Sequence, residues 1–127
     1  MTVVLDASAV IAVLRSEQGA DRVQSVLGNA MISAVNLQEV FKELLEDNIA
    51  PDLAHAMVQQ LQLDVCDHDE TAALHAAALH TATKRYGRGI GDRSCMSLAI
   101  SKGVPVLTAD KEWARVEVDG LDIVFIR

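Results

Sequence analysis

Short apolar runs alternate with segments of helical pattern along this chain. Runs rich in Val, Ile and Leu predict strands at residues 2–5, 30–33, 63–66, 104–108 and 121–126. Between them, apolar residues recur at helical spacing or Ala-rich stretches occur, which predicts helices at residues 9–14, 36–45, 51–61, 70–86, 92–102 and 111–114. Strands that alternate with helices indicate parallel pairing with helices on both faces. The predicted fold class is therefore α/β, a three-layer α/β/α sandwich with a mostly parallel central sheet.

The length of the chain and its continuous series of predicted elements indicate one domain, residues 1–127. The chain has 127 residues, half of them hydrophobic, and shows no linker, repeat or low-complexity segment. Its first residues lack a basic region and reach an acid at Asp6, and no apolar run approaches the length of a membrane span. We therefore expect a cytoplasmic protein that does not contact a membrane.

Composition limits how the chain can bind nucleic acid. Eleven Lys and Arg against eighteen Asp and Glu give a net charge of −7, so a polyanion is not attracted by the overall charge. The aromatic residues, two Phe, one Tyr and one Trp, are too few for extensive base stacking. The two Cys and four His lack the spacing of a zinc site. Any nucleic acid must be held by a local basic segment, by divalent cations, or by both.

Four acids fall where the predicted strands end. Asp6 ends the first strand, Glu39 lies just after the second, Asp92 opens the helix after a glycine-rich turn, and Asp110 follows the strand that ends at Thr108. In an open parallel sheet, ligands bind beyond the carboxyl ends of the strands. Each acid alone has a simpler interpretation as a helix cap, including a capping box of Asn36 with Glu39. Their joint position at one edge indicates a shared site.

Such a cluster predicts a metal site. Two carboxylates about 4 Å apart repel each other by about 4 kcal/mol at an effective dielectric constant of 20, and a cation removes that repulsion. Oxygen ligands favour one or two Mg²⁺ or Mn²⁺ ions over zinc, and such sites hydrolyse phosphodiester bonds with a metal-activated water. Glu39 and Asp110 are the two candidates to accept the proton of that water.

Other polar residues near these acids are candidates for supporting roles. Ser8 and Thr108 each lie two residues from one of the acids and can orient a water or a phosphate, or act as local caps. A basic segment beside Asp92 is a candidate for contacts with RNA phosphates, although cations also favour a helix C-terminus; it contains Lys84, Arg85, Arg88 and Arg93.

Four blocks of sequence, in order, carry a family resemblance. They are VLDASA at 4–9, ISAVNLQEV at 32–40, GDRSC at 91–95 and LTAD at 107–110 followed by Trp113. Together they resemble the PIN-domain family, specifically the VapC-type toxins of bacterial type II toxin–antitoxin pairs. The resemblance covers nearly the whole chain.

The resemblance implies a PIN-like α/β/α fold and a Mg²⁺- or Mn²⁺-dependent endoribonuclease that acts as the toxin of a toxin–antitoxin pair. It implies a homodimer and inhibition by a cognate VapB-type antitoxin. Matched position by position, the acids of the family fall on Asp6, Glu39, Asp92 and Asp110, with Asp6 and Asp92 as the foremost direct metal ligands. It does not name the RNA that is cleaved.

Competing interpretations differ in how they use the acids. A receiver-type signalling domain needs an adjacent acid pair after the first strand, and a haloacid-dehalogenase-like phosphatase needs a D-x-D motif, whereas this chain has Asp6-Ala7-Ser8. Both are disfavoured. A non-catalytic metal- or RNA-binding PIN-like module and a housekeeping RNA-processing nuclease stay open as alternatives.

Overall fold

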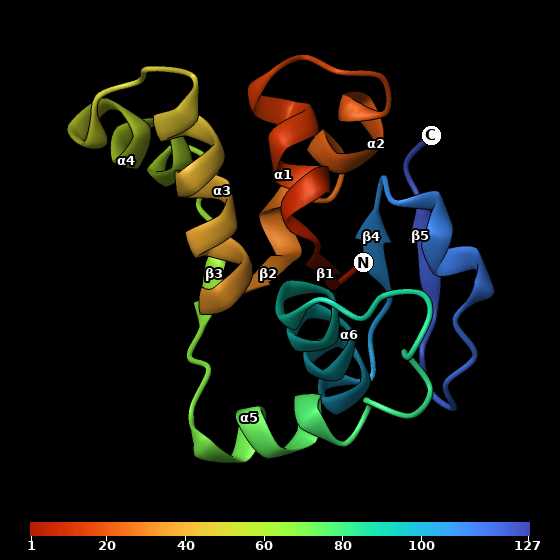
Figure 1. Ribbon diagram of the computed structural model, residues 1–127. Helices are drawn as coiled ribbons and strands as arrows, with labels where there is room; N and C mark the ends of the chain where they lie inside the picture. Colours follow the sequence, from red (N-terminus) through yellow and green to blue (C-terminus); the bar gives the residue numbers. More distant parts are fainter.

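A five-stranded parallel sheet forms the centre of the protein in a computed structural model that describes residues 1–127 (Figure 1). The strand order is β3-β2-β1-β4-β5, and all four pairings are parallel. The strands are β1 (Val3–Leu5), β2 (Ala30–Ser33), β3 (Asp64–Cys66), β4 (Val106–Thr108) and β5 (Ile123–Phe125). The predicted α/β class and parallel sheet are confirmed.

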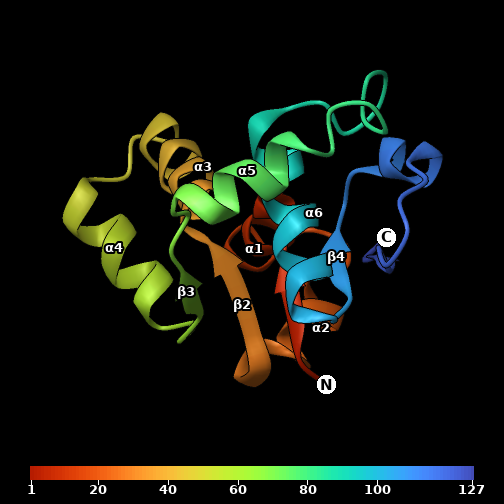
Figure 2. The same ribbon diagram turned by 90° about the horizontal axis from the view of Figure 1, so that it is seen from below.

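Helices cover the two faces of this sheet. They are α1 (Ala7–Leu14), α2 (Ala20–Gln24), α3 (Ala34–Glu46), α4 (Pro51–Gln59), α5 (Glu70–Ala77) and α6 (Ile90–Lys102), with 3₁₀ helices η1 (Leu27–Asn29) and η2 (Lys111–Arg115). None of the helices is long and apolar enough to cross a membrane. In Figure 2, α4 and β3 lie at one end of the molecule and β4 and the C-terminus at the other.

Alternation along β1, the central strand, explains why its sequence is apolar throughout. Val3 and Leu5 of β1 belong to a core formed with α1, α3 and α4, whereas Val4 between them belongs to a second core with α6 and Trp113 of η2. Side chains of successive strand residues point to opposite faces, so a strand covered on both faces needs an apolar residue at every position. The result is the expected three-layer sandwich.

The order of the strands places a topological switch point between β1 and β4. The chain moves outward from β1 through β2 to β3, and then returns to the other side of β1 to form β4 and β5. The connections beyond the carboxyl ends of β1 and β4 therefore diverge, which leaves a crevice between them, the usual ligand position in such folds. Asp6 and Asp110 follow these two strands.

One predicted helix was wrong in its extent. The Ala-rich segment 70–86 was expected to be a single helix, but α5 ends at Ala77. Beyond it, the buried hydroxyl of Thr83 donates to the carbonyl of Leu79 at 2.7 Å and accepts from the guanidinium of Arg93 on α6 at 3.0 Å. Residues 78–89 form turns and bends instead, and the bond to Arg93 attaches this connection to α6.

Smaller differences concern element boundaries and two helices. Helix α3 begins at Ala34 and α6 at Ile90, each two residues earlier than predicted, and β4 and β5 are each shorter than predicted. Helices α2 and η1 were not expected from the pattern of apolar positions. None of these differences moves the four acids away from the carboxyl edge of the sheet.

Candidate metal and nucleic-acid site

All four sequence-predicted acids line one hollow at the carboxyl edge of the sheet. The hollow has a volume of about 300 Å³, and we call it the acid hollow; its carboxylates include Asp6, Glu39, Asp92 and Asp110. The acids come from the end of β1, the first half of α3, the first turn of α6 and the residue before η2. The structure therefore brings together residues that are up to 104 positions apart in the sequence.

Asp6 is the most buried of the four acids. It is only 6 % exposed, and it stands at the N-terminus of α1 without a side-chain hydrogen bond that caps the helix. The hydroxyls of Ser8 and Thr108 both donate to its Oδ2, at 2.7 and 2.8 Å. Burial raises the pKa of Asp6 above its ordinary value, although these two hydrogen bonds oppose the shift. A buried carboxylate that does not cap its helix requires another explanation.

Ser8 and Thr108 connect β1 and β4 as well as holding Asp6. Their hydroxyl oxygens are 3.3 Å apart, and the Ser8 hydroxyl accepts the amide N–H of Ala109 at 2.9 Å. The Thr108 hydroxyl accepts the amide N–H of Asp110 at 3.0 Å. The two hydroxyls thus set the position of both Asp6 and the backbone of Asp110.

Glu39 is positioned by a side chain from its own helix. The amide nitrogen of Asn36 donates to Glu39 Oε1 at 2.9 Å and also to the carbonyl of Gly91 at 2.9 Å. Partial burial is the largest cause that raises the pKa of Glu39, and repulsion from Asp6 and Asp92 adds to it. A Cβ atom on Gly91 would collide with the Glu39 carboxyl group, so the glycine leaves room for that side chain.

The sequence-based interpretation of Asn36 as a helix cap was wrong. Ser33 is the N-cap of α3, and its hydroxyl accepts the amide N–H of Val35 at 3.2 Å. Asn36 is fully buried inside the first turns of that helix and joins it to the start of α6. Sequence reasoning missed this role, because nothing in the local pattern indicates the contact with Gly91.

Asp92 and Asp110 combine a local hydrogen bond with the shared position. Asp92 Oδ2 accepts the amide N–H of Gly89 at 3.3 Å, and Asp110 Oδ1 accepts that of Glu112 at 3.0 Å. Burial raises the pKa of Asp92, and repulsion from Asp6 raises it further. Helix capping therefore explains the local hydrogen bonds of these two acids. It does not explain why they lie close enough to Asp6 for the carboxylates to repel one another.

The donor set fits a hydrated hard cation better than a closed protein cage. No three of the His, Cys, Asp and Glu side chains already converge to hold a metal by themselves. Mg²⁺ usually keeps several waters and binds proteins through one or two carboxylates. Two buried polar atoms beside this cluster have no hydrogen-bond partner. They are Asn36 Oδ1, on the residue whose amide nitrogen donates to Glu39, and Trp113 Nε1, in the short helix η2 that follows Asp110. Unpaired buried groups of this kind are satisfied by ordered water.

The cations that line the acid hollow were not the ones expected from the sequence. They are Arg15 at the end of α1, Lys42 on α3, and Arg127 at the C-terminus. Arg15 pairs with Glu43 and Asp47 at 3.1 and 2.9 Å, and these partners raise its pKa. The three cations lie far from one another in the sequence, so no local cluster of basic residues indicates that they line the acid hollow.

The predicted basic segment lies beside α6 and outside the acid hollow. Lys84, Arg85 and Arg88 are exposed in the connection between α5 and α6, which passes along α6 in Figure 1. The Arg93 guanidinium donates to Thr83 and holds this connection in place. Their contact with RNA therefore stays a prediction.

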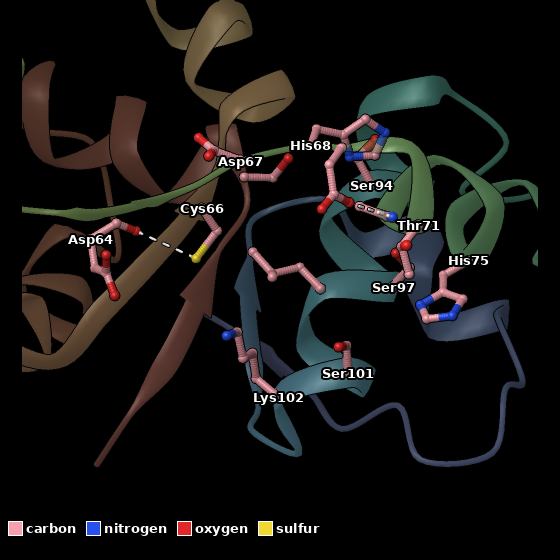
Figure 3. Close-up of a pocket in the computed structure, with 14 residues that line it drawn as sticks. Asp64, Cys66, Asp67, His68, Thr71, His75, Ser94, Ser97, Ser101 and Lys102 are labelled. Atoms are coloured by element: carbon pink, nitrogen blue, oxygen red, sulfur yellow. Dashed lines mark hydrogen bonds between the residues drawn. The ribbon is translucent and has the colours of Figure 1, made fainter.

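A separate polar hollow of about 540 Å³ contains none of the four acids. It lies between β3, α5 and α6, and Figure 3 shows His75, Ser97, Ser101 and Lys102 around it. Its carboxylates are exposed, and one of them, Asp69, caps α5 by accepting the amide N–H of Ala72 at 2.9 Å. The convergent, repelling carboxylates are therefore found in the acid hollow and not here.

A family model decides the relationship of this chain to known proteins. The model of the PIN domain matches residues 3–119. The chain belongs to the PIN domain family. No curated protein sequence matches it significantly.

Solved structures share the fold of this PIN domain. A DNA-bound VapBC from Salmonella typhimurium contains a chain with 23 % identity and a TM-score of 0.74, covering 100 % of this chain and 99 % of that one. A chain of a toxin–antitoxin complex from Klebsiella pneumoniae has 15 % identity and a TM-score of 0.74, covering 99 % of this chain and 98 % of that one. A chain of VapBC-1 from nontypeable Haemophilus influenzae has 21 % identity and a TM-score of 0.71, covering 99 % of this chain and 98 % of that one. At these identities the likeness is one of fold.

Proposed function

We propose that this PIN domain is a metal-dependent endoribonuclease that acts as the toxin of a toxin–antitoxin pair. The observation that carries the proposal is that Asp6, Glu39, Asp92 and Asp110 line one hollow at the switch point of the sheet. Burial and mutual repulsion raise the pKa of three of them, which is the electrostatic situation that a divalent cation relieves.

Asp6 and Asp92 are the residues that we expect to hold Mg²⁺ or Mn²⁺, with Glu39 and Asp110 completing the ligand set for one or two ions. The hydroxyls of Ser8 and Thr108 both donate hydrogen bonds to Asp6 Oδ2, and these bonds fix the orientation of the carboxylate. When bound, the cation supplies an activated water and stabilises charge on the phosphodiester. The protein contributes the orientation of the ligands and the exclusion of bulk water around Asp6.

Glu39 is the stronger of the two candidates to accept the proton of the attacking water. Its pKa is raised by burial and by Asp6 and Asp92, and a carboxylate with a raised pKa is a better base near neutral pH. Its Oε1 accepts from Asn36, which leaves Oε2 available. Asp110 already accepts the amide N–H of Glu112 through one oxygen.

A protein partner enters the proposal through three of the solved structures that share the fold, which are of VapBC and toxin–antitoxin complexes. The RNA substrate enters through the resemblance of the four sequence blocks to VapC-type toxins. We propose an RNA substrate, a VapB-type antitoxin and a homodimer for this chain. An antitoxin segment that carries basic side chains would be attracted to the acid hollow, since opposite charge steers association. Phosphate contacts are proposed for the cations that line the hollow and for the exposed basic segment 84–93.

Cleavage of RNA by the purified protein tests the enzymatic part. We expect cleavage with Mg²⁺ or Mn²⁺ that EDTA abolishes and that Asp6→Asn and Asp92→Asn each remove. Asp52→Asn is the matched control, because Asp52 is an exposed acid in the first turn of α4 and should not affect activity. Cleavage that is independent of metal, or that survives in Asp6→Asn, would reject this mechanism. Cleavage by no form of the protein would favour a non-catalytic binding module.

Expression in cells tests the toxin part. We expect induction of the wild type to arrest growth, induction of Asp6→Asn to have no effect, and co-expression of the product of an adjacent small open reading frame to restore growth and co-purify. An active enzyme whose induction cells tolerate without a partner would instead support a housekeeping RNA-processing nuclease.

A further inference from the structure

A second hollow lies beside the acid hollow, between the first half of α3 and the start of α6. It has a volume of about 630 Å³, within the range of small-molecule sites, and we call it the α3–α6 hollow. It shares Glu39, Lys42 and Asp92 with the acid hollow. The two hollows therefore lie on either side of the same carboxylates.

We propose that the α3–α6 hollow binds the nucleotide next to the phosphodiester that is cleaved. Ile90 provides an apolar surface for its base, and Gln38 provides hydrogen bonds to the edge of that base. This inference rests on the proposed ribonuclease activity and adds to it a position at which RNA sequence is recognised.

Ile90 is the apolar surface that the proposal uses. It is 75 % exposed although it is a large aliphatic residue, and it lies at the first position of α6 on the wall of the hollow. No aromatic residue lines this hollow, and Trp113 is fully buried in the core. Enzymes hold an unstacked base between aromatic or apolar side chains, so an aliphatic residue is the group available here for that contact.

Gln38 is the polar group that can distinguish bases. It is exposed and lines the hollow, and its side-chain amide makes no hydrogen bond within the protein. A side-chain amide carries donors and an acceptor on one plane, so it can form two hydrogen bonds with a base edge. Glu39 and Asp92 line the same hollow, which places a base bound at Gln38 close to the carboxylates of the acid hollow.

Lys42 connects the two hollows electrostatically. It lies one helical turn after Gln38 on the same face of α3 and lines both hollows. Its ion pair with Glu46, at 3.3 Å, is well exposed on both sides, so the pair is weak and Lys42 is available to a phosphate. A strand that passes from one hollow to the other would carry its phosphate beside this ammonium group.

A protein segment is the competing occupant of this hollow. Only Val35 and Ile90 are apolar among its lining residues, and the rest are polar, charged or glycine. Protein interfaces bury large apolar or aromatic anchors in their central pockets, which this lining does not provide. The lining and its continuity with the acid hollow favour a nucleotide.

Cut-site sequencing on RNA tests the subsite. A pool of single-stranded RNA of randomised sequence is cleaved with Mg²⁺ by wild type, Gln38→Ala and Ile90→Ala, and the ends are sequenced. We expect wild type to prefer particular bases at a position adjacent to the cut. Gln38→Ala should lose the base preference at that position and keep the preferences at other positions of the RNA. Ile90→Ala should raise KM about fivefold, at the lower end of base-stacking effects, with kcat within about twofold. The controls are Gln59→Ala on α4 and Leu74→Ala, a similarly exposed aliphatic on α5.

Hydrolysis of bis(p-nitrophenyl) phosphate separates the subsite from the catalytic carboxylates. This diester has no base edge for Gln38 to recognise, so Gln38→Ala should hydrolyse it as wild type does, whereas Asp6→Asn should not. Unchanged cut patterns and KM in both variants, with an active wild type, overturn the subsite and leave the ribonuclease. An altered oligomeric mass in Ile90→Ala with unchanged cutting assigns the residue to a protein interface. A wild type that cleaves no RNA rejects the ribonuclease and the subsite together.

Discussion

One amide nitrogen of Asn36 joins the helix that carries Glu39 to the turn that carries Asp92. It donates to Glu39 Oε1 and to the carbonyl of Gly91, each at 2.9 Å, and the residue is fully buried. Residues 36 and 91 are 55 positions apart, so this contact forms only when α3 and α6 pack together. The position of Glu39 relative to Asp92 thus depends on one side chain.

Replacement of Asn36 by Ala should therefore weaken both activity and stability. Glu39 loses its positioning donor and the hydrogen bond from Asn36 to the Gly91 carbonyl is lost, and a lost intramolecular hydrogen bond costs about 0.5–1.5 kcal/mol. We expect kcat for RNA cleavage to fall at least about tenfold with a smaller change in KM, measured together with thermal unfolding. A matched control is Asn29→Ala, at the exposed end of η1, where the backbone has no left-handed conformation. If Asn36→Ala loses stability but keeps the wild-type kcat, the residue supports the fold and does not position Glu39.

Gly91→Ala tests the space around Glu39 without removing a hydrogen-bonding group. The added methyl group would collide with the Glu39 carboxyl group, which must rotate away. A displacement of about 1 Å at a catalytic group can reduce the rate about 100-fold, whereas Ala in a helix is more stable than Gly by up to about 1 kcal/mol. We expect lower activity at nearly unchanged or slightly raised Tm. Gly28→Ala is the control, because a methyl group at that position would have no atom within 4 Å.

Asp6→Asn should stabilise the metal-free protein while it abolishes cleavage. Burial disfavours the charged carboxylate and Asp110 repels it, so removal of the charge relieves an unfavourable interaction. An amide oxygen can still accept from Ser8 or Thr108. We expect Tm in EDTA to rise by a few degrees, since about 1 kcal/mol shifts Tm by about 4 °C in a domain of this size, and activity to fall at least about 100-fold. A decrease of Tm in EDTA would contradict the electrostatic account of the site.

The metal-free protein should become less stable as pH rises from about 4 to neutrality. The folded-state pKa values of Asp6, Glu39 and Asp92 are raised, so the folded state binds more protons than the unfolded chain in this window and the free energy of unfolding falls with pH. Below the unfolded values, near 4, the penalty disappears because both states are protonated. Thermal unfolding in EDTA across this range measures the slope, and a flatter slope in Asp6→Asn assigns it to the acid hollow.

Addition of Mg²⁺ or Mn²⁺ should reverse this loss at neutral pH. A ligand that binds only the folded state stabilises it by about 2.7 kcal/mol at one hundred times its Kd. We expect the increase in Tm to be largest near pH 7 and to shrink toward pH 4.5, because protons compete for the same carboxylates. Asp92→Asn should reduce the increase, and Asp52→Asn should not. An equal increase at both pH values would place the cation elsewhere.

The general position of the four acids was predictable because it follows from local pattern and one rule of topology. Parallel strands end at the same edge, so acids that follow strands in the sequence lie along that edge whatever the order of the strands. Asp6 and Asp110 are next to β1 and β4, and these strands turn out to be neighbours at the switch point. The strand order itself was not needed for the prediction.

Contacts between distant segments were not predictable from the same patterns. Arg15 and Arg127 reach the acid hollow from the end of α1 and from the C-terminus, and their partners lie far along the chain. The segment after α5 is attached to α6 by the hydrogen bond between Thr83 and Arg93, which forms only when α6 is in place. In each case the deciding partner is tertiary, so periodicity and propensity contain no signal for it.

The hydrogen bonds that hold Asp6 in place join the beginning of the chain to its end. Thr108 donates to Asp6 across 102 positions, and Ala109 donates to Ser8 across 101. A chain still emerging from the ribosome has Asp6 and Glu39 but not the partners that assemble them with Asp92 and Asp110. If the proposed activity is correct, synthesis of this protein yields no active nuclease until Thr108 and Asp110 have been translated, which gives a co-translationally bound inhibitor time to arrive first.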